Sequence, residues 1–395
     1  MNAFGTDSSR KVIQQLESAG HEAVFVGGSI RDYLLGKDAS DIDIATSASP
    51  DEVKRVFPHT FDVGIAHGTV LVMMDHEPIE VTTYRTESTY TDHRRPDEVI
   101  FVKSLKEDLQ RRDFTINALA LTLEGELIDP FGGKEDLEKQ VIRSVGNASD
   151  RFDEDALRMV RAVRFSSVLG FDIEKYTLKA ISDYAKMIQH VSVERIKVEM
   201  DKLWMGIEPE KALTYIVESG LSEHLPKFPD EVHRLASCAP FTAAAQGWSA
   251  LMLCGQFTAG EISAAYKMSN REKAFLTAVQ EAFDSRLTGR FTTDHYYRFT
   301  IDVLTAAEKV WHAFHPTEYR ISEDEMVRNQ RELPIRSKDE LEVDGGDLMT
   351  WTEQRGGRWV GEWMDKIEKA VLYRTCPNDA EKIKGWFLNE YKREK

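Results

Sequence analysis

The sequence has 395 residues, of which 42% are hydrophobic and 30% are charged, and its formal net charge is −16. This length predicts two to four domains, and the negative charge argues against broad, non-specific nucleic-acid binding while leaving room for a local basic groove. No run approaches about 18 uninterrupted apolar residues, so we expect no membrane partner. The 3 cysteines are scattered, match no zinc spacing and predict a reduced, cytoplasmic location.

The first 145 or so residues mix short strands and helices. A capped amphipathic helix is expected at the N-terminus, and Ser49-Pro50 predicts a further helix over 51–57. Runs of apolar and β-branched residues predict strands at 23–26, 41–44, 69–74, 79–84, 118–123 and 126–128. We therefore predict an α+β domain with a small mixed or mostly antiparallel sheet.

One stretch of this region, VGGSIRDYLLG followed closely by DIDIAT, combines a glycine pair with two aspartates. Gly27 and Gly28 let backbone N–H groups approach a phosphate, and the helix expected after them would point its positive end at the same place. On a strand, Asp41 and Asp43 would leave one face together while the isoleucines enter the core. Two carboxylates on one face suit Mg²⁺. A metal and nucleotide-phosphate site is the first hypothesis, and an exposed Asp pair beside a structural turn is the alternative.

Two further features lie between the aspartates and the next cluster. Glu80, on a predicted strand, could approach Asp41 and Asp43 as a third carboxylate, although a solvent-facing Glu on a half-buried strand is the favoured interpretation. Residues 85–99, RTESTYTDHRRPDEV, are polar and contain a proline. They predict a long mobile loop, and such loops in compact domains tend to be functional.

A second cluster reads EDLQRRDFTINA. Arg112 could clamp a triphosphate or a ribose with its planar guanidinium. Arg111 lies beside it, and Asp113 is a candidate N-cap of a short helical turn. The alternative is a surface ion-pair network within the cluster, and the sequence does not separate the two.

A third cluster, EDALRMVRAVRF, places Asp155, Arg158, Arg161 and Arg164 at three-residue spacing. On an α-helix this spacing keeps all four residues in one slowly rotating stripe. Asp155 can accept from an exocyclic amine and Arg158 can donate to ring acceptors, which is the pattern of base-edge recognition, while the other arginines would take phosphates. The alternative is a solvated helix face with Glu154 and Asp155 as partial counterions.

From this cluster onward the pattern is helical. A last amphipathic helix is expected to open near Trp359. The other predicted helices cover residues 155–169, 175–190, 192–204 and 208–219.

Together these motifs resemble those of the bacterial class II CCA-adding enzymes, the tRNA nucleotidyltransferases of the poly(A) polymerase superfamily. The matching runs include EVTTYRTE with DHRRPD, DLQRRDFTINALAL, IDPFGG, EDALRMVRAVRF and SVERIKVEMDKL, besides the glycine and aspartate motif. The match is dense over the first 205 or so residues and looser in the tail, through VDGGDLM. The resemblance implies a catalytic head over 1–145, a nucleotide-selecting neck over 146–205, a body over 206–335 and a tRNA-binding tail over 336–395, the last three helical.

The activity implied by the resemblance is template-independent addition of C, C and A to the 3′ end of tRNA from CTP and ATP. Asp41 and Asp43 would be catalytic and hold two Mg²⁺ ions in an in-line displacement that releases pyrophosphate. The nucleotide would be contacted by Gly28, Arg31, Arg112, Asp155, Arg158, Arg161 and Arg164. Supporting residues would be Gly27, Arg111, Asp113 and Glu154, the last by positioning Arg158. The tRNA would be held by its acceptor arm and elbow, and the sequence leaves a homodimer open.

Several alternatives remain at this point. Poly(A) polymerases and the A-adding and CC-adding enzymes share the head motifs, although the complete 85–99 loop argues against a CC-only form. An Asp-x-Asp glycosyltransferase would also use a metal and a nucleotide, but it would leave the arginine stripe unexplained. A non-catalytic RNA-binding module would tolerate the substitution Asp41→Ala.

Overall fold

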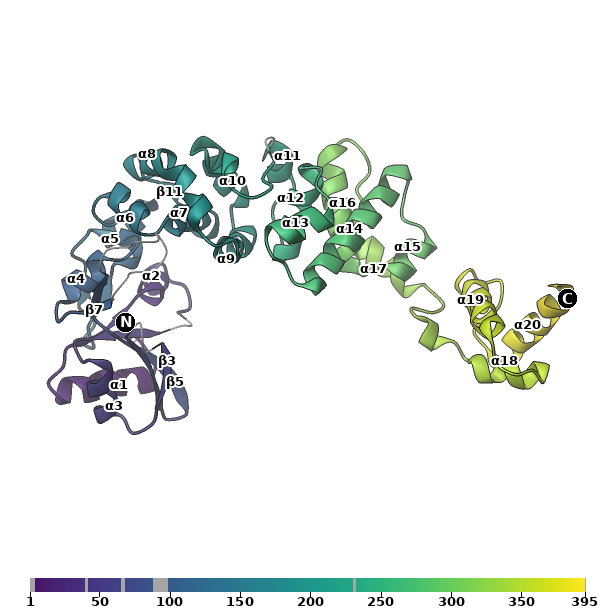
Figure 1. Cartoon of the computed structure of the whole chain (residues 1–395), viewed down its shortest axis with the longest axis horizontal. Coiled ribbons are helices and arrows are strands. Elements are labelled where there is room, and N and C mark those ends of the chain that lie inside the picture. Colours follow the sequence, from purple (N-terminus) through teal and green to yellow (C-terminus); the bar gives the residue numbers. More distant parts are fainter. Residues whose placement is uncertain (1–3, 40–41, 65–67, 88–98, 230–231, 395) are drawn as a thin grey trace. The chain divides into compact units, whose positions relative to one another are not determined.

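The computed structural model of the chain describes residues 4–39, 42–64, 68–87, 99–229 and 232–394. The chain forms two compact units. The first contains Met1–Gly247 and Ala265–Lys267, and the second contains Trp248–Ala264 and Met268–Lys395. The first unit begins with a sheet and continues in helices, whereas the described part of the second unit is helical (Figure 1). This confirms the predicted fold class, an α+β head followed by helices.

The sheet of the first unit has seven strands in the order β3-β4-β5-β2-β1-β8-β9. Among its described pairs, β2 and β5 run parallel and the others run antiparallel, which confirms a mixed sheet. Its strands are β1 (Ala23–Val26), β2 (Asp43–Thr46), β3 (Thr60–Gly64), β4 (Thr69–Met74), β5 (Glu77–Thr83), β8 (Ala120–Leu121) and β9 (Leu127–Ile128).

Strand β3 is the one strand of this sheet that the sequence did not predict. It is an edge strand paired with β4 through an irregular register. Its apolar residues Phe61 and Val63 are 58% and 61% exposed, so they do not form the buried face by which strands were identified. An exposed edge explains why the pattern was missed.

The helices that flank the sheet begin where the capping residues predict. The first, α1 (Asp7–Ser18), is capped by Thr6 and buries Val12 and Leu16. The helix α3 (Pro50–Val56) has proline at its first position and a complete capping box from Ser49. Between them, α2 (Gly28–Leu34) starts directly after β1.

The predicted 85–99 loop is bounded by short strands. Strand β6 (Arg85–Glu87) pairs antiparallel with β7 (Val99–Phe101), so the ends of this segment are ordered as a hairpin and not as loop. Most of the predicted loop, residues 88–98, lies outside the described residues.

The rest of the first unit is mainly helical. A short parallel pair is formed by β10 (Val141–Ile142) and β11 (Asp172–Ile173). The helices are α4 (Leu105–Gln110), η2 (Thr115–Asn117), α5 (Gly133–Glu138), α6 (Ala148–Glu154), α7 (Leu157–Leu169), α8 (Lys175–Tyr184), η3 (Ala185–His190), α9 (Val193–Trp204), α10 (Pro209–Glu218), η4 (Leu221–Glu223) and α11 (Val232–Ser237).

The second unit begins within helix α12 (Ala244–Cys254) and contains most of helix α13 (Ala259–Ala265). Its core near the C-terminus contains Trp363, Ile367 and Phe387, and the predicted helix near Trp359 is confirmed as α19 (Arg358–Leu372). None of the helices in the described ranges is both long and apolar enough to cross a bilayer. The remaining helices are α14 (Asn270–Thr288), α15 (Thr293–Arg298), α16 (Ile301–Phe314), α17 (Glu323–Arg331), η5 (Lys338–Glu340), α18 (Gly345–Thr352), α19 (Arg358–Leu372) and α20 (Ala380–Glu394).

Candidate functional site

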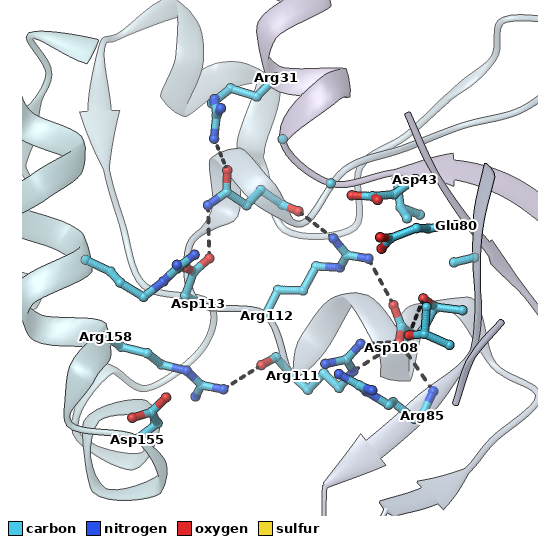
Figure 2. A pocket seen from close by; sticks show the side chains of 18 of the residues that line it. Arg31, Asp43, Glu80, Arg85, Asp108, Arg111, Arg112, Asp113, Asp155 and Arg158 are labelled. Atoms are coloured by element: carbon cyan, nitrogen blue, oxygen red, sulfur yellow. Dashed lines mark hydrogen bonds and ion pairs between the residues drawn. The ribbon is translucent and has the colours of Figure 1, made fainter. Parts of the chain in front are cut away.

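A cavity of about 500 Å³ lies in the first unit, within the size range of small-molecule sites (Figure 2). Most of the predicted site residues line it, although they come from distant segments of the chain. These are Gly27, Gly28, Arg31, Asp43, Glu80, Arg111, Arg112, Asp113, Asp155, Arg158 and Arg161. Glu154 and Arg164 are not among the lining residues. The predicted catalytic residue Asp41 lies outside the described residues.

One wall of the cavity carries two carboxylates. Asp43 and Glu80 are register partners in the parallel pair β2–β5, so their side chains leave the same face of the sheet. Figure 2 shows both carboxylates on the same side of the cavity. Behind Asp43, Ile44 is fully buried as predicted, whereas Ile42 precedes the strand and is only partly buried.

The glycine pair lies directly against this acidic wall. Gly27 has φ +88°, and a Cβ placed on it would lie 3.1 Å from Asp43 Oδ2. Gly28 is the first residue of α2. Glycine is therefore required at position 27 for two reasons, the positive φ and the close approach of a carboxylate.

The oxygen donors fit a hard divalent cation. Asp43 and Glu80 offer carboxylate oxygens, the ligands that Mg²⁺ prefers, and open space in the cavity could take phosphate oxygens. In the described part of the chain, no third His, Cys, Asp or Glu joins such a pair to form a metal-binding group.

A basic wall adjoins this acidic wall and is anchored on Asp108. Arg111 Nη2 lies 2.9 Å from Asp108 Oδ1, and Arg112 Nη2 lies 3.3 Å from Asp108 Oδ2. Burial raises the pKa of Asp108, but the charges of the two arginines outweigh this effect and lower it. The predicted ion-pair network is thus present in part, but it is centred on the buried Asp108 and is not a surface network, and both arginines also line the cavity.

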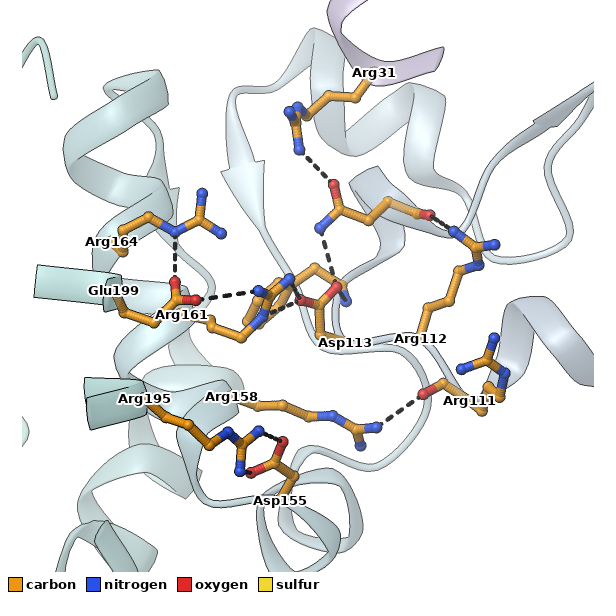
Figure 3. Close-up of polar contacts among 12 residues, drawn as sticks. Arg31, Arg111, Arg112, Asp113, Asp155, Arg158, Arg161, Arg164, Arg195 and Glu199 are labelled. Atoms are coloured by element: carbon orange, nitrogen blue, oxygen red, sulfur yellow. Dashed lines mark hydrogen bonds and ion pairs between the residues drawn. The ribbon is translucent and has the colours of Figure 1, made fainter. Parts of the chain in front are cut away.

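Asp113 occupies the centre of a polar network (Figure 3). Its carboxylate accepts from Arg161 Nη2 at 2.6 Å and from Asn117 Nδ2 at 3.0 Å. Arg31 Nη1 in turn donates to Asn117 Oδ1 at 2.7 Å. Burial raises the pKa of Asp113, but the Arg161 charge and the hydrogen bonds lower it to about 2. Asp113 is not the N-cap that was predicted, because η2 is preceded by Phe114 in that position.

Two arginines of α7 are paired with carboxylates that were not predicted as their partners. Arg161 pairs with Asp113, and Glu199 of α9 accepts from Arg164 Nε at 2.9 Å. Arg164 is buried, and its guanidinium lies 3.6 Å from the centre of the Phe165 ring. The predicted counterions were wrong for these two arginines, and the contacts of Arg164 are those of a buried ion pair.

Asp155 does not belong to the helical stripe. Helix α7 begins at Leu157, and Asp155 has extended backbone angles, φ −146° and ψ 101°, at the end of α6. Its Oδ1 accepts from the backbone N–H of Leu157 at 3.1 Å, and its Oδ2 accepts from Arg195 Nη2 at 2.7 Å. The break between the two helices nevertheless leaves Asp155 on the cavity wall.

Arg158 is held in place from three directions. Nη1 lies 2.6 Å from Glu154 Oε2 and also donates to the carbonyl of Arg151, and Nη2 donates to the carbonyl of Arg111 at 3.0 Å. Only 8% of Arg158 is exposed. The predicted contact between Glu154 and Arg158 is therefore present, and Arg158 links the helical part of the cavity to its basic wall.

Sequence reasoning missed ten lining residues. Arg85, Asn117 and Arg195 were visible as polar residues inside or beside the motifs, but nothing in their spacing placed them at the cavity. The full set is Val26, Ala45, Thr69, Thr82, Arg85, Asp108, Asn117, Leu157, Phe165 and Arg195.

Three protein families match successive parts of the chain. The Poly A polymerase head domain matches residues 23–143, the Probable RNA and SrmB- binding site of polymerase A matches residues 170–231, and the tRNA nucleotidyltransferase domain 2 (putative) matches residues 239–387. The first match ends before Asp155, Arg158 and Arg195, so the cavity includes residues beyond the segment that matches the head-domain family.

Similar proteins cover nearly the whole chain. A CCA-adding enzyme of Bacillus cytotoxicus is 42% identical over 95% of this chain and 96% of that protein, and one of Bacillus cereus is 42% identical over 98% of both. The crystal structure of the Bacillus stearothermophilus CCA-adding enzyme in complex with CTP superposes with a TM-score of 0.86 at 37% identity, over 98% of both chains.

Proposed function

The chain belongs to the CCA-adding enzymes, a family of tRNA nucleotidyltransferases, and we propose that the cavity described above is the site where it adds C, C and A to tRNA. CTP, ATP and the tRNA 3′ end are its substrates. The observation that carries the proposal is the convergence of the Asp43–Glu80 wall and the Asp155–Arg158 pair on one cavity. Family membership sets aside the glycosyltransferase and the non-catalytic RNA-binding module.

Enzymes of this family generally depend on Mg²⁺. We propose that Asp43 and, from its position in the sequence, Asp41 hold the metal, with Glu80 as a third oxygen donor. The ions would activate the 3′-hydroxyl and neutralise the leaving pyrophosphate. The chain's own contribution is to present the Asp43 and Glu80 carboxylates at one end of the cavity, next to a backbone that approaches closely because residue 27 is glycine.

The basic wall would hold the triphosphate. Arg111 and Arg112 are oriented by the buried Asp108, so their guanidinium groups are held in place before the nucleotide arrives. Gly28 and Arg31 would contact the nucleotide from the start of α2. Arg161 would do so from α7, where Asp113 holds it.

Asp155 and Arg158 would select the base. Cytosine and adenine both place an amino group beside an unprotonated ring nitrogen, which suits a carboxylate acceptor next to a guanidinium donor. Uracil and guanine place a carbonyl oxygen and a protonated ring nitrogen at these positions, so both contacts would become repulsive or unpaired. Glu154 would act through Arg158, and Arg164 through Glu199 and the packing of α7 on α9.

The division into head, neck, body and tail at residues 145, 205 and 335 remains part of the proposal, as does tRNA binding by the body and tail. A tRNA-processing enzyme with bacterial relatives would act in the cytoplasm, and we extend the proposal to that location. The helices of the second unit would provide the surface for the acceptor arm and elbow.

The proposal is tested with tRNA transcripts that end before C, C and A. The purified protein is incubated with Mg²⁺ and CTP, ATP or both, and the products are sequenced. We expect CC with CTP alone and CCA with both nucleotides. Arrest at CC with both nucleotides, A added only to a CC end, or a long A tail would each contradict the proposal.

A further inference from the structure

Arg195 of α9 lies on the cavity wall and makes a two-pronged contact with Asp155 (Figure 3). Its Nη2 lies 2.7 Å from Asp155 Oδ2, and its Nη1 lies 3.3 Å from Asp155 Oδ1. The side chains are 32% and 16% exposed, so the pair borders the open cavity and is not part of the core.

Asp155 needs such a partner because its backbone lies between two helices. The residue has extended φ and ψ angles, and α7 starts only at Leu157. Rotation of the carboxylate is opposed by two contacts, the Leu157 N–H on Oδ1 and the Arg195 guanidinium on both oxygens. Since the Leu157 contact holds only one oxygen, the direction in which Oδ2 faces depends on Arg195.

Arg158 has no comparable dependence on Arg195. It is held by Glu154 and by the carbonyl groups of Arg151 and Arg111. Separate sets of residues thus position the two members of the proposed base-selecting pair. Arg158 is positioned by residues of α6 and the basic wall, and Asp155 is positioned by Arg195 of α9.

We propose that Arg195 is a positioning residue that orients the Asp155 carboxylate toward the amino group of the incoming base and so enforces the choice of C and A over U and G. This inference rests on the proposed role of Asp155. With Arg195 paired to it, Oδ2 keeps its remaining lone pair for an exocyclic amine. Without Arg195, the carboxylate can rotate away, and the contact that distinguishes an amino from a carbonyl group is weakened.

The test compares R195A and R195K with D155A and the double variant D155A/R195A. K202A, which removes an exposed charge from the same helix, is the matched control. For each protein, kcat/KM is measured for addition of CTP, ATP and UTP to truncated tRNA. Thermal unfolding of each variant is recorded to show that it is folded.

We expect R195A to lower kcat/KM for CTP and ATP by about 10- to 100-fold, the size of one base-edge contact, and to change the value for UTP by less than about 3-fold. Lysine keeps the positive charge but has a single ammonium group in place of the two-pronged guanidinium, so the loss of kcat/KM in R195K should be smaller than in R195A. Since Arg195 acts through Asp155, adding R195A to D155A should cause no further change in the CTP to UTP ratio.

Three results would overturn the proposal. These are unchanged kcat/KM values for CTP and ATP in R195A, an equal loss for all three nucleotides, and a further drop in the CTP to UTP ratio when R195A is added to D155A. A failure of the proposed function looks different, because D155A itself would then keep the wild-type ratio. A folded D155A with a lowered ratio, beside R195A with a normal ratio, rejects the role of Arg195 alone.

Discussion

Asp43 and Glu80 are register partners across the one parallel pair described in the sheet, and both face the cavity. Partners on neighbouring parallel strands keep a fixed separation, so the sheet holds the two carboxylates together without a dedicated contact between them. The parallel pairing of β2 with β5 therefore places Glu80, the weakest of the sequence candidates, beside Asp43, one of the two predicted catalytic residues.

Replacing Glu80 with Gln should lower the rate of nucleotide addition by at least about 100-fold, because a charged oxygen donor toward the metal is lost. The matched control is E77Q on the same strand. Glu77 accepts from the Thr6 hydroxyl, a bond that Gln preserves, and it does not line the cavity. Single-turnover assays over a range of Mg²⁺ concentrations measure the effect, and equal rates in E80Q and E77Q would assign Glu80 to the solvated face.

Replacing Gly27 with Ala should abolish most nucleotide addition, because the new Cβ would crowd Asp43 Oδ2 at 3.1 Å. Gly125 provides the control. It has φ +89°, close to the +88° of Gly27, but a Cβ there meets nothing within 4 Å. Both variants should lose stability from the positive φ, and G27A should lose about 1–3 kcal/mol because φ +88° with ψ −155° lies in a region that only glycine readily adopts. Only G27A should lose activity. The measurements are urea unfolding and tRNA extension, and similar activity in both variants would contradict the close-approach argument.

Asp113 should make the stability of the protein fall at acidic pH. Its folded-state pKa of about 2 lies below the ordinary 3.8, so the unfolded chain binds more protons between these values. The contribution, about 2 kcal/mol, is fully present above pH 4 and is lost as the pH falls toward 2. Urea unfolding at a series of pH values measures it.

The variant D113N is the comparison for this pH dependence. It leaves Arg161 without its closest carboxylate and should be destabilised by about 3–5 kcal/mol at pH 7. Its stability should also fall less between pH 4 and pH 2 than that of the wild type. Parallel curves for the two proteins would show that Asp113 does not carry the effect.

Much of the fold follows from local patterns. The capping box at Ser49, the β-branched strand runs and the apolar stripe of α7 all appear at the expected places because each depends on neighbours within a few residues. Helix α7 starts at Leu157, later than predicted. The break before it could not be read from the sequence, because Ala156 in the N-cap position has no capping side chain and neither Gly nor Pro marks the break.

The polar partners could not be predicted in the same way. Arg161 and Asp113 are 48 residues apart, and Arg195 and Asp155 are 40 apart, so no local spacing pairs them. The motifs identified about half of the residues that line the cavity, since their chemistry suits a nucleotide. The packing of α7 against α9 and against the segment that carries Asp113 decides which arginine is neutralised by which carboxylate, and that information lies in the tertiary structure.

The central claim is that Asp43 belongs to the catalytic wall of a nucleotide-adding site. Its most direct test is the variant D43N, assayed for addition of CTP to a truncated tRNA, with tRNA binding measured in parallel. Asparagine keeps the size of the side chain and removes its charge, so the account predicts near-complete loss of CTP addition with tRNA binding unchanged. Addition at the wild-type rate by a folded D43N protein would contradict it.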